Sequence, residues 1–224
     1  MKHLRARAAY LLRTEGVRGL LASGCRYLAS LGLAVFYVER YVVFRFDTDT
    51  SAFPVRRPDI DGLEVFVLER VEHVERLAER GFDVTLFDSG RRRRWLQSGG
   101  VAFCAYVNRE LAHIAWVAMS AAAREFYDEL PYDVDFEHGE AWWGGSYTGS
   151  WFRGRGIYTY VCGIRLKYVH EHGYHSCRDA VRMDNVASLK GQGGWNPRPR
   201  VAGRLVHFFK WTSWEECASQ RGDG

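Results

Sequence analysis

The stretch Arg153-Gly-Arg-Gly-Ile-Tyr158 alternates arginine with glycine directly before a segment in which apolar residues recur at helical spacing. The apolar residues on this helical face are Ile157, Val161, Ile164 and Tyr168. Glycines at 154 and 156 let the backbone approach an anion closely, and the start of a helix offers unpaired N–H donors and the positive end of its dipole. These residue types in this order predict a turn that binds a phosphate or a pyrophosphate.

Two common phosphate-binding motifs are excluded by the order of these residues. A Walker loop ends in Gly-Lys-Ser or Gly-Lys-Thr, and a dinucleotide fingerprint needs a third glycine and an acid about 20 residues further on. Neither pattern occurs around residues 153–158. A different phosphate-binding turn is therefore indicated, and the strand pattern Glu140-Ala-Trp-Trp-Gly-Gly-Ser-Tyr-Thr148 leads into it.

This turn and a second motif downstream resemble the GNAT acyltransferases. Motif A of that family reads Gln/Arg-x-x-Gly-x-Gly/Ala where its fourth strand meets its third helix, and Arg153 and Gly156 match this pattern. Tyr158 stands where the family has a small residue. The segment Asp184-Asn-Val-Ala-Ser188 stands where the family commonly has Asn-x-x-Ser/Ala at the start of its next helix.

The fold implied by this resemblance is of the α+β (mixed α/β) class. It has a central, mostly antiparallel sheet that splays between its fourth and fifth strands and is flanked by helices. The similarity covers about residues 35–211 in order and is specific in 147–188. The expected parts are a basic helical N-terminal extension (1–34), the GNAT-like domain (35–215) and a polar tail (216–224).

The resemblance also implies acetyl-CoA as the co-substrate. Its pyrophosphate would bind the turn at 153–158, and its pantetheine arm would pair with strand backbone between the splayed strands. The residues assigned to acetyl-CoA in this way are Tyr147, Thr148, Arg153, Gly154, Arg155, Gly156, Ile157, Tyr158, Asn185 and Ser188. For Asn185 an alternative remains open, since an Asn at a helix start also caps that helix with its own side chain.

Transfer of an acyl group to an amine needs a base, because amines are protonated at neutral pH. Glu140 is the predicted base, since it begins the strand that leads into motif A, where related enzymes often place a carboxylate. The aromatic residues that follow Glu140 would help to exclude water from it. Glu137 and His138 are the nearest competitors for this role.

The departing thiolate of CoA would be protonated by an acid. The family usually has a Tyr seven residues after the motif Asn, but Gln192 stands there and cannot donate a proton as an acid. Tyr147 is the predicted acid, with Tyr158 as the alternative, and a third option is that the thiolate leaves without an acid. No cysteine has a base partner in the sequence, which favours direct attack by the amine in a ternary complex.

The elements that position these residues follow from the rest of the pattern. Strand signals are β-branched and aromatic runs bounded by polar turns, and they cover Tyr41–Phe46, Leu63–Leu68, Val101–Val107, Leu111–Val117, Ser176–Met183 and Val201–Trp211. The two runs that flank Asn108-Arg-Glu110 predict an antiparallel hairpin. Helical signals cover Val71–Arg80, a segment that begins after Asp88-Ser89, and the start of 121–136. Interleaved strands and helices predict a mixed sheet covered by helices.

Composition limits the class of protein. With 224 residues, of which 47% are hydrophobic, the chain can bury one substantial core. A net charge of +4, with both signs mixed along the chain, indicates no nucleic-acid partner. Five scattered cysteines favour a reducing compartment over a disulfide framework. No apolar run reaches the ~18 residues of a membrane span, and no signal peptide is recognisable, so a cytoplasmic protein is predicted.

Several features admit a second interpretation. Residues 1–34 are basic and amphipathic and could lie on a membrane surface, although packing on the domain or on the second subunit of a homodimer is favoured. The segment 170–177 holds three His and one Cys, but its spacing matches no standard zinc pattern, so no metal is expected. The run Arg91–Arg94 is interpreted as a solvated face, with an anionic ligand as the alternative. Trp142 and Trp143 face opposite ways if they lie in a strand, so one is expected in the core and the other on the sheet surface, with the floor of an acceptor pocket as the alternative.

The predicted function is transfer of an acetyl group from acetyl-CoA to an amine on a small molecule or a peptide. Two other classes remain open. A non-catalytic acyl-CoA-binding module would explain why Gln192 replaces the usual Tyr. A protein associated with a membrane or a complex would act through residues 1–34, with the GNAT-like domain as a scaffold.

Overall fold

The structure is a computed structural model that describes residues 36–49, 55–127, 130–195 and 198–218. The predicted extension over 1–34 lies outside these residues. The strands are β1 (Phe36–Asp47), β2 (Leu63–Leu68), β3 (Val101–Val107), β4 (Glu110–Ala118), β5 (Glu140–Thr148), β6 (Ser176–Arg182), β7 (Arg198–Phe208) and β8 (Trp211–Ala218). The α-helices are α3 (Val71–Glu79), α4 (Gly90–Gln97), α5 (Ala121–Glu125), α6 (Ile157–Glu171) and α7 (Val186–Gly193). Short 3-10 turns are η1 (Thr85–Phe87), η2 (Phe136–His138) and η3 (Ser150–Phe152).

Hydrogen bonds link the described strands in the order β2-β3-β4-β5-β6-β1-β7-β8. The pairs β2–β3, β3–β4, β4–β5 and β1–β6 are antiparallel, and β5–β6 is parallel. The predicted hairpin of β3 and β4 is confirmed, with its turn at Asn108 and Arg109 in the left-handed region. The predicted mixed α/β class with a mostly antiparallel sheet is therefore also confirmed.

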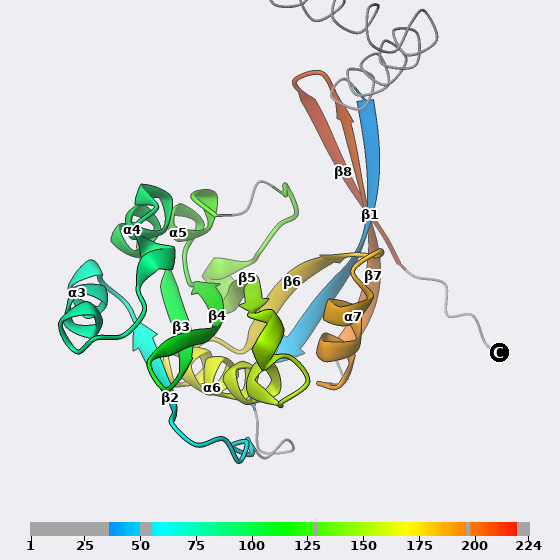
Figure 1. The fold of residues 1–224 in the computed structure, drawn as a ribbon. Coiled ribbons are helices and arrows are strands. Elements are labelled where there is room, and N and C mark those ends of the chain that lie inside the picture. Colours follow the sequence, from blue (N-terminus) through cyan, green and yellow to red (C-terminus); the bar gives the residue numbers. More distant parts are fainter. Residues whose placement is uncertain (1–35, 50–54, 128–129, 196–197, 219–224) are drawn as a thin grey trace, which may run out of the picture. The chain divides into compact units, whose positions relative to one another are not determined.

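The chain divides into two compact units, and the larger consists of Arg40–Gly203 and Glu216–Gly224. In this unit α6 covers one face of the sheet, whereas α3, α4 and α5 lie against the other face (Figure 1). The core under α6 includes Phe46, Trp143 and Leu166. Because both faces are covered, β3 is buried from end to end and β4 over most of its length, which explains their nearly continuous apolar sequences.

The adjacent residues Trp142 and Trp143 show how completely β5 is covered. Successive side chains of a strand point to opposite faces. Trp143 stacks on Phe46 on the α6 side, and Trp142 packs edge-on against Trp95 of α4 on the other side. Both indoles are buried, so both belong to the core, whereas only one was expected there, because helices cover both faces of the sheet.

The smaller unit consists of Met1–Glu39 and Arg204–Glu215, and its described part is the start of β1 with the hairpin of β7 and β8. The prediction of one final strand over Val201–Trp211 is wrong, since β7 ends at Phe208 and β8 begins at Trp211. Phe209 and Lys210 form the turn, and Phe209 has φ +52°. Neither is a Gly, Asn, Asp or Pro, so the sequence carries no turn signal at this point.

Candidate active site

Strands β5 and β6 pair over only three rungs before they separate. The paired residues are Glu140↔Ser176, Ala141↔Cys177 and Trp142↔Arg178. Beyond Trp142, no described strand pairs with β5 on that side. Counted from β2, these are the fourth and fifth strands, so the splay is where the resemblance placed it. The separation leaves the edge of β5 that faces β6 without a strand partner after Trp142, so an extended ligand could pair with the backbone there.

A β-bulge lies in β5 directly after the point of separation. Between the pairs Ile114↔Tyr147 and Trp116↔Gly144, one residue of β4 opposes two residues of β5, Gly145 and Ser146. Gly145 adopts φ +58°, and a Cβ there would collide with the hydroxyl of Tyr127, so this position requires glycine. The bulge reverses the alternation of side chains, which places Ser146 and Thr148 on the α6 face.

Arg165 of α6 stabilises the bulge from the α6 face of the sheet. Its Nη1 donates to Ser146 Oγ at 3.0 Å and its Nη2 donates to the backbone oxygen of Trp116 at 3.1 Å. The guanidinium also lies 4.2 Å from the centre of the Trp143 ring. This fully buried cation thus ties α6 to both strands at the irregularity.

The predicted phosphate turn joins β5 to α6 through η3. Gly154 and Gly156 adopt φ +72° and +81°, and Gly156 is the N-cap of α6. No side chain caps this 15-residue helix, so its first N–H groups remain available to a ligand. Residues 153–156 are exposed, and Arg153 Nε donates to the backbone oxygen of Thr148 at 3.1 Å. The turn therefore has the conformation and the charge that an anion requires.

Tyr158, which is bulkier than the residue in the family motif, is accommodated by α7. A Cβ on Gly191 would lie 2.8 Å from the Tyr158 ring, so the ring packs directly on that glycine. The ring also meets His113 edge-on, and His113 Nδ1 lies 2.8 Å from Thr148 Oγ1. Burial, together with the charge of Arg165, lowers the pKa of His113 to about 3, so this imidazole is neutral. Burial raises the pKa of Tyr158, so its hydroxyl keeps its proton.

Asn185 and Gln192 lie at the two ends of α7. Asn185 Oδ1 accepts a hydrogen bond from Ser188 N at 3.2 Å, so the capping role is present and engages only the oxygen of the amide. Gln192 is buried and its Nε2 donates to Asp179 Oδ2. The same Asp179 oxygen accepts from Trp143 Nε1 at 3.2 Å. This carboxylate of β6 therefore links α7 to β5 one residue beyond the last paired rung.

Glu140 is buried at the closed end of the splay, with 2% of its surface exposed. Its Oε2 accepts from Asp135 N at 3.1 Å and lies 3.7 Å from Arg178 Nη1, and its Oε1 lies 3.4 Å from Arg45 Nε. Oε1 accepts no hydrogen bond. The carboxylate is thus held by two cations with one oxygen left as a potential proton acceptor.

The competitors of Glu140 lie in η2. Glu137 and His138 are exposed, and His138 Nδ1 is 2.8 Å from Asp135 Oδ1. Neither side chain has the enclosed surroundings of Glu140. Tyr147 is exposed and follows the bulge on the face opposite α6.

The buried thiols of Cys162 and Cys177 are not activated as nucleophiles. Burial raises the pKa of Cys162 on α6 to about 11 and that of Cys177 on β6 to about 12. Both therefore remain protonated at neutral pH, and a thiol is a far weaker nucleophile than a thiolate.

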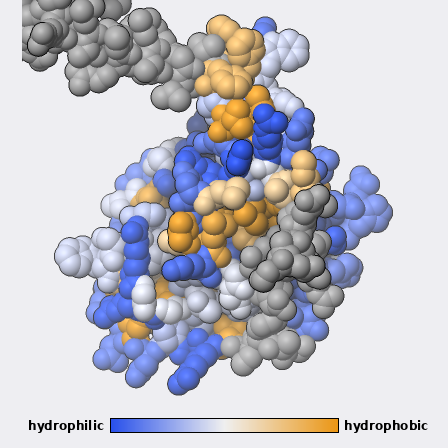
Figure 2. Space-filling view, turned by 90° about the vertical axis from the view of Figure 1, so that its right-hand side faces the viewer, coloured by the Kyte–Doolittle hydropathy of each residue, from blue (hydrophilic) through white to orange (hydrophobic). Residues whose placement is uncertain are grey.

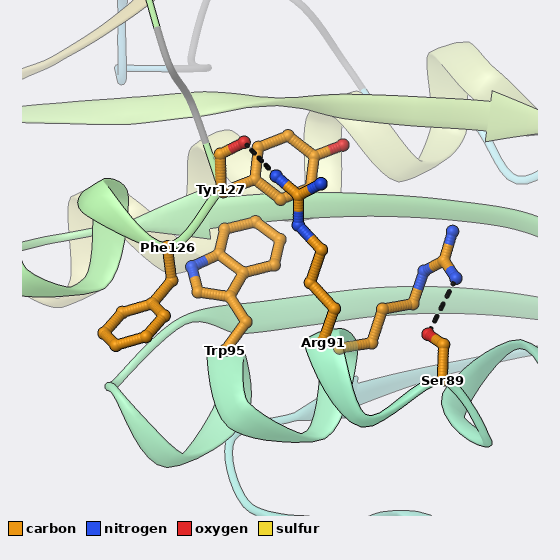
Figure 3. A pocket seen from close by; sticks show the side chains of 6 residues that line it. Ser89, Arg91, Trp95, Phe126 and Tyr127 are labelled. Carbon is orange, nitrogen blue, oxygen red and sulfur yellow. Dashed lines mark hydrogen bonds between the residues drawn. The ribbon is translucent and has the colours of Figure 1, made fainter. Parts of the chain in front are cut away.

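A cavity of about 300 Å³ opens on the face of the sheet opposite α6. Its lining residues are Ser89, Arg91, Arg92, Trp95, Phe126 and Tyr127. Figure 3 shows Trp95 and Tyr127 side by side as its aromatic wall, with Arg91 reaching up from α4 to the backbone oxygen of Tyr127. Because the Tyr127 hydroxyl lies over Gly145, one side chain connects this cavity to the bulge.

The run Arg91–Arg94 is only partly the solvated face that was expected. Arg91 and Arg94 are exposed, whereas Arg92 and Arg93 are half-buried. Arg92 Nη1 donates to the neutral oxygens Leu86 O and Ser89 Oγ, at 3.0 and 3.3 Å. No carboxylate of the described residues forms an ion pair with Arg92.

Four site features were missed from the sequence. The Gly144-Gly145 pair inside a strand is itself a signal of a bulge. An arginine within the apolar face of a helix, such as Arg165, could have been flagged as a buried cation. Asp179 and Tyr127 carried no signal, because their partners lie far away in the chain.

No protein-family model matches the chain, and no curated protein sequence does so either. A tandem GNAT protein from the clavulanic acid biosynthesis pathway matches with a TM-score of 0.52 at 16% identity, over 85% of this chain and 58% of that chain. An acetyltransferase of the GNAT family from Colwellia psychrerythraea matches with a TM-score of 0.46 at 12% identity, over 81% and 61%. A conserved protein of unknown function from Staphylococcus epidermidis matches with a TM-score of 0.49 at 9% identity, over 81% and 66%.

The match to the tandem GNAT protein shows that the chain has the GNAT fold. At this identity the fold alone is shared, since a fold carries many activities. The chain spans 57 to 66% of the length of the first three structures that it matches.

Two features are absent from the described residues. No three His, Cys, Asp or Glu side chains among them are grouped to hold a metal ion. In the segment 170–177, which holds three His and one Cys, His172 Nδ1 is 2.7 Å from Tyr168 O and His170 Nδ1 is 3.2 Å from Thr48 Oγ1. Within the same residues, no helix is long and apolar enough to cross a membrane.

Proposed function

We propose that this protein is an N-acetyltransferase that uses acetyl-CoA to acetylate an amine. Two features together carry the proposal. The parallel strands β5 and β6 separate after three rungs, and the helix α6, which follows β5 in the chain, has no side-chain cap at its N-terminus. Backbone donors for an extended ligand and donors for a phosphate then lie along one path, as a CoA thioester requires. Release of free thiol from acetyl-CoA in the presence of an amine panel tests the proposal.

In this proposal the pyrophosphate of CoA binds the turn at 153–156 and the first N–H groups of α6, beside Arg153 and Arg155. The pantetheine arm pairs with β5 around Tyr147 and Thr148. Ser188 and Asn185 of α7 lie on the other side of the arm. Tyr158 and Ile157 anchor the first turn of α6 through their packing, since Ile157 is buried.

Glu140 is the proposed base, because its side chain lies on the face of β5 that carries Trp142 and the cavity beyond it. The amine would lose its proton to Glu140, directly or through water, and attack the thioester carbonyl. The protonated thiols of Cys162 and Cys177 favour this direct attack over an acyl-enzyme intermediate. Tyr147 is the proposed acid for the thiolate, since it lies where the bulge ends and its hydroxyl reaches solvent.

Replacement of Asn185 by Asp separates the two roles of this residue. An Asp at an N-cap still accepts the hydrogen bond from Ser188, so the melting temperature should stay close to that of the parent. The Nδ2 donor is lost and a negative charge is added, so acetyl-CoA should bind about tenfold more weakly. Calorimetric titration with acetyl-CoA measures the change in affinity. If the parent and Asn185→Asp bound acetyl-CoA equally well, helix capping would be the only role of Asn185.

The cavity on the face opposite α6 is the proposed acceptor site. It combines an aromatic wall with Arg92, a half-buried cation whose partners are neutral oxygens. Such a site favours an acceptor that has a planar or apolar body and carries a carboxylate or a phosphate besides its amine.

Replacement of Arg92 by Gln should raise KM for acidic acceptors about tenfold or more, because a charge-assisted hydrogen bond is lost. The KM of matched acceptors without the acidic group should change little, and kcat should be kept in both cases. Arg94→Gln is the matched control, since Arg94 is exposed on the same helix and does not line the cavity. The assignment would be refuted if Arg92→Gln raised KM no more than Arg94→Gln does, or raised KM equally for acidic and neutral acceptors.

A second candidate is a non-catalytic module that binds acyl-CoA. The observation that favours it is Gln192, which is buried at the position of the usual acid and is hydrogen-bonded to Asp179. The module would be established if calorimetry showed binding of acetyl-CoA and no amine of a broad panel led to the release of free thiol.

A further inference from the structure

The most exposed of the large apolar side chains that the structure describes is Trp151, with 87% of its surface in solvent. Trp151 belongs to η3, the short turn between β5 and the glycine turn at 153–156. Other apolar side chains are exposed as well, and Figure 2 shows hydrophobic side chains gathered in the middle of the face that it displays. Exposure alone therefore does not distinguish Trp151, but its place directly before the glycine turn does.

The backbone that carries Trp151 is held in place by its neighbours. Phe152 is buried, and a Cβ on Gly149 would lie 3.2 Å from the Phe152 ring, so these two residues pack closely. Gly149 N donates to Ala112 O at 3.0 Å, which ties the start of η3 to β4. An indole that is so exposed gains little free energy of folding from burial. Stability therefore does not explain a Trp at this position.

The charge beside Trp151 is positive. Arg153 and Arg155 are exposed, and neither forms an ion pair with a carboxylate of the described residues. Between Glu140 and Glu171 the chain has four basic residues and no acidic one. An anion at the glycine turn would therefore meet two cations that have no acidic partner, next to an exposed aromatic ring.

The elements that pack against the turn do not cancel this charge. The loop 55–62 comes closest to Gly156 at Pro58, where a Cβ on Gly156 would lie 3.7 Å away, and it carries two arginines and two aspartates. Its charges thus balance. Helix α7, which packs on Tyr158 through Gly191, carries Lys190 and no acidic residue.

We propose that Trp151 stacks on the adenine base of CoA and makes the site selective for thioesters that carry this nucleotide. The inference rests on the proposed function, because that function places the pyrophosphate at the glycine turn. A nucleotide combines phosphate groups with a base whose flat face stacks on aromatic side chains. Trp151 and Gly154 are three residues apart, so their Cα atoms lie at most about 11 Å from each other, and one nucleotide could contact both.

The test compares two thioesters by calorimetric titration of the full chain. Acetyl-CoA carries the nucleotide, whereas acetyl-phosphopantetheine has the same arm without the adenine base, so the parent should bind acetyl-CoA more tightly. Trp151→Ser should weaken binding of acetyl-CoA about tenfold or more, the usual effect of losing one stacked base, and leave binding of acetyl-phosphopantetheine unchanged. Trp151→Phe should keep most of the affinity, because it keeps an aromatic face. Both variants should melt at the temperature of the parent.

Trp211→Ser is the matched control, because Trp211 is 72% exposed but belongs to the smaller unit. It should bind both thioesters as the parent does. If Trp151→Ser bound acetyl-CoA as tightly as the parent, the stacking would be overturned and the proposed function would stand. The stacking would also be overturned if the parent bound the two thioesters equally, or if Trp151→Ser lost affinity for both. If the parent bound neither thioester, the cofactor site and the stacking would fail together.

Discussion

Replacement of Gly156 by Val should abolish measurable binding of acetyl-CoA. Gly156 is the N-cap of α6 and adopts φ +81°, so a β-branched residue would shift the turn out of the conformation in which its N–H groups converge. Each lost hydrogen bond to a charged phosphate costs about 1.5–3 kcal/mol, and two of them weaken binding by about a hundredfold or more. Calorimetric titration of acetyl-CoA into both proteins measures the effect.

Gly173→Val is the control for backbone strain. Gly173 follows the other end of α6 with φ +85°, and a Cβ there would meet no atom within 4 Å. Both substitutions should lower stability by about 1–2 kcal/mol through the left-handed conformation alone. Only Gly156→Val should lose the cofactor. If Gly156→Val still bound acetyl-CoA as tightly as Gly173→Val does, the phosphate site would lie elsewhere.

Replacement of Glu140 by Gln should lower kcat/KM by about a hundredfold to ten-thousandfold, the usual contribution of a general base. The rising limb of the pH profile should disappear, because no carboxylate remains to accept the proton of the amine. Affinity for acetyl-CoA should be kept, since Glu140 lies at the opposite end of β5 from the phosphate turn. A pH series of kcat/KM, with calorimetry of cofactor binding, provides the measurement.

Glu140 also forms ion pairs with Arg45 and Arg178, so the effect of losing these ion pairs needs a control. Its replacement should cost less stability than the about 3–5 kcal/mol of an uncompensated buried charge, because Arg178 keeps its ion pair with Glu216. Arg45→Gln removes one ion pair and keeps the carboxylate, so this variant should retain the rising limb. Glu137→Gln, at the exposed competitor, should also leave the profile unchanged. A parental profile in Glu140→Gln would exclude Glu140 from the mechanism.

The order of the strands up to β6 and the glycine turn before α6 were predictable, because both depend on short-range signals, whereas binding of a phosphate at that turn stays a prediction. Apolar and aromatic runs on either side of a polar turn identified β3 and β4, and the glycines 154 and 156 identified the start of α6. The surroundings of Glu140 were not predictable, since Arg45 and Arg178 come from strands 95 and 38 residues away along the chain. The turn at Phe209 was not predicted for a different reason. A Phe rarely adopts the left-handed backbone conformation that this turn has.

The hydrogen bonds of Asp179 limit how far β5 and β6 can separate at the closed end of the splay. Trp143 of β5 and Gln192 of α7 donate to one oxygen of this carboxyl group, just beyond the last rung between β5 and β6. Parting Trp143 from Asp179 would leave a buried carboxyl group short of one donor, a loss that costs about 1–3 kcal/mol. The point at which the two strands diverge is therefore fixed by side chains as well as by the backbone ladder.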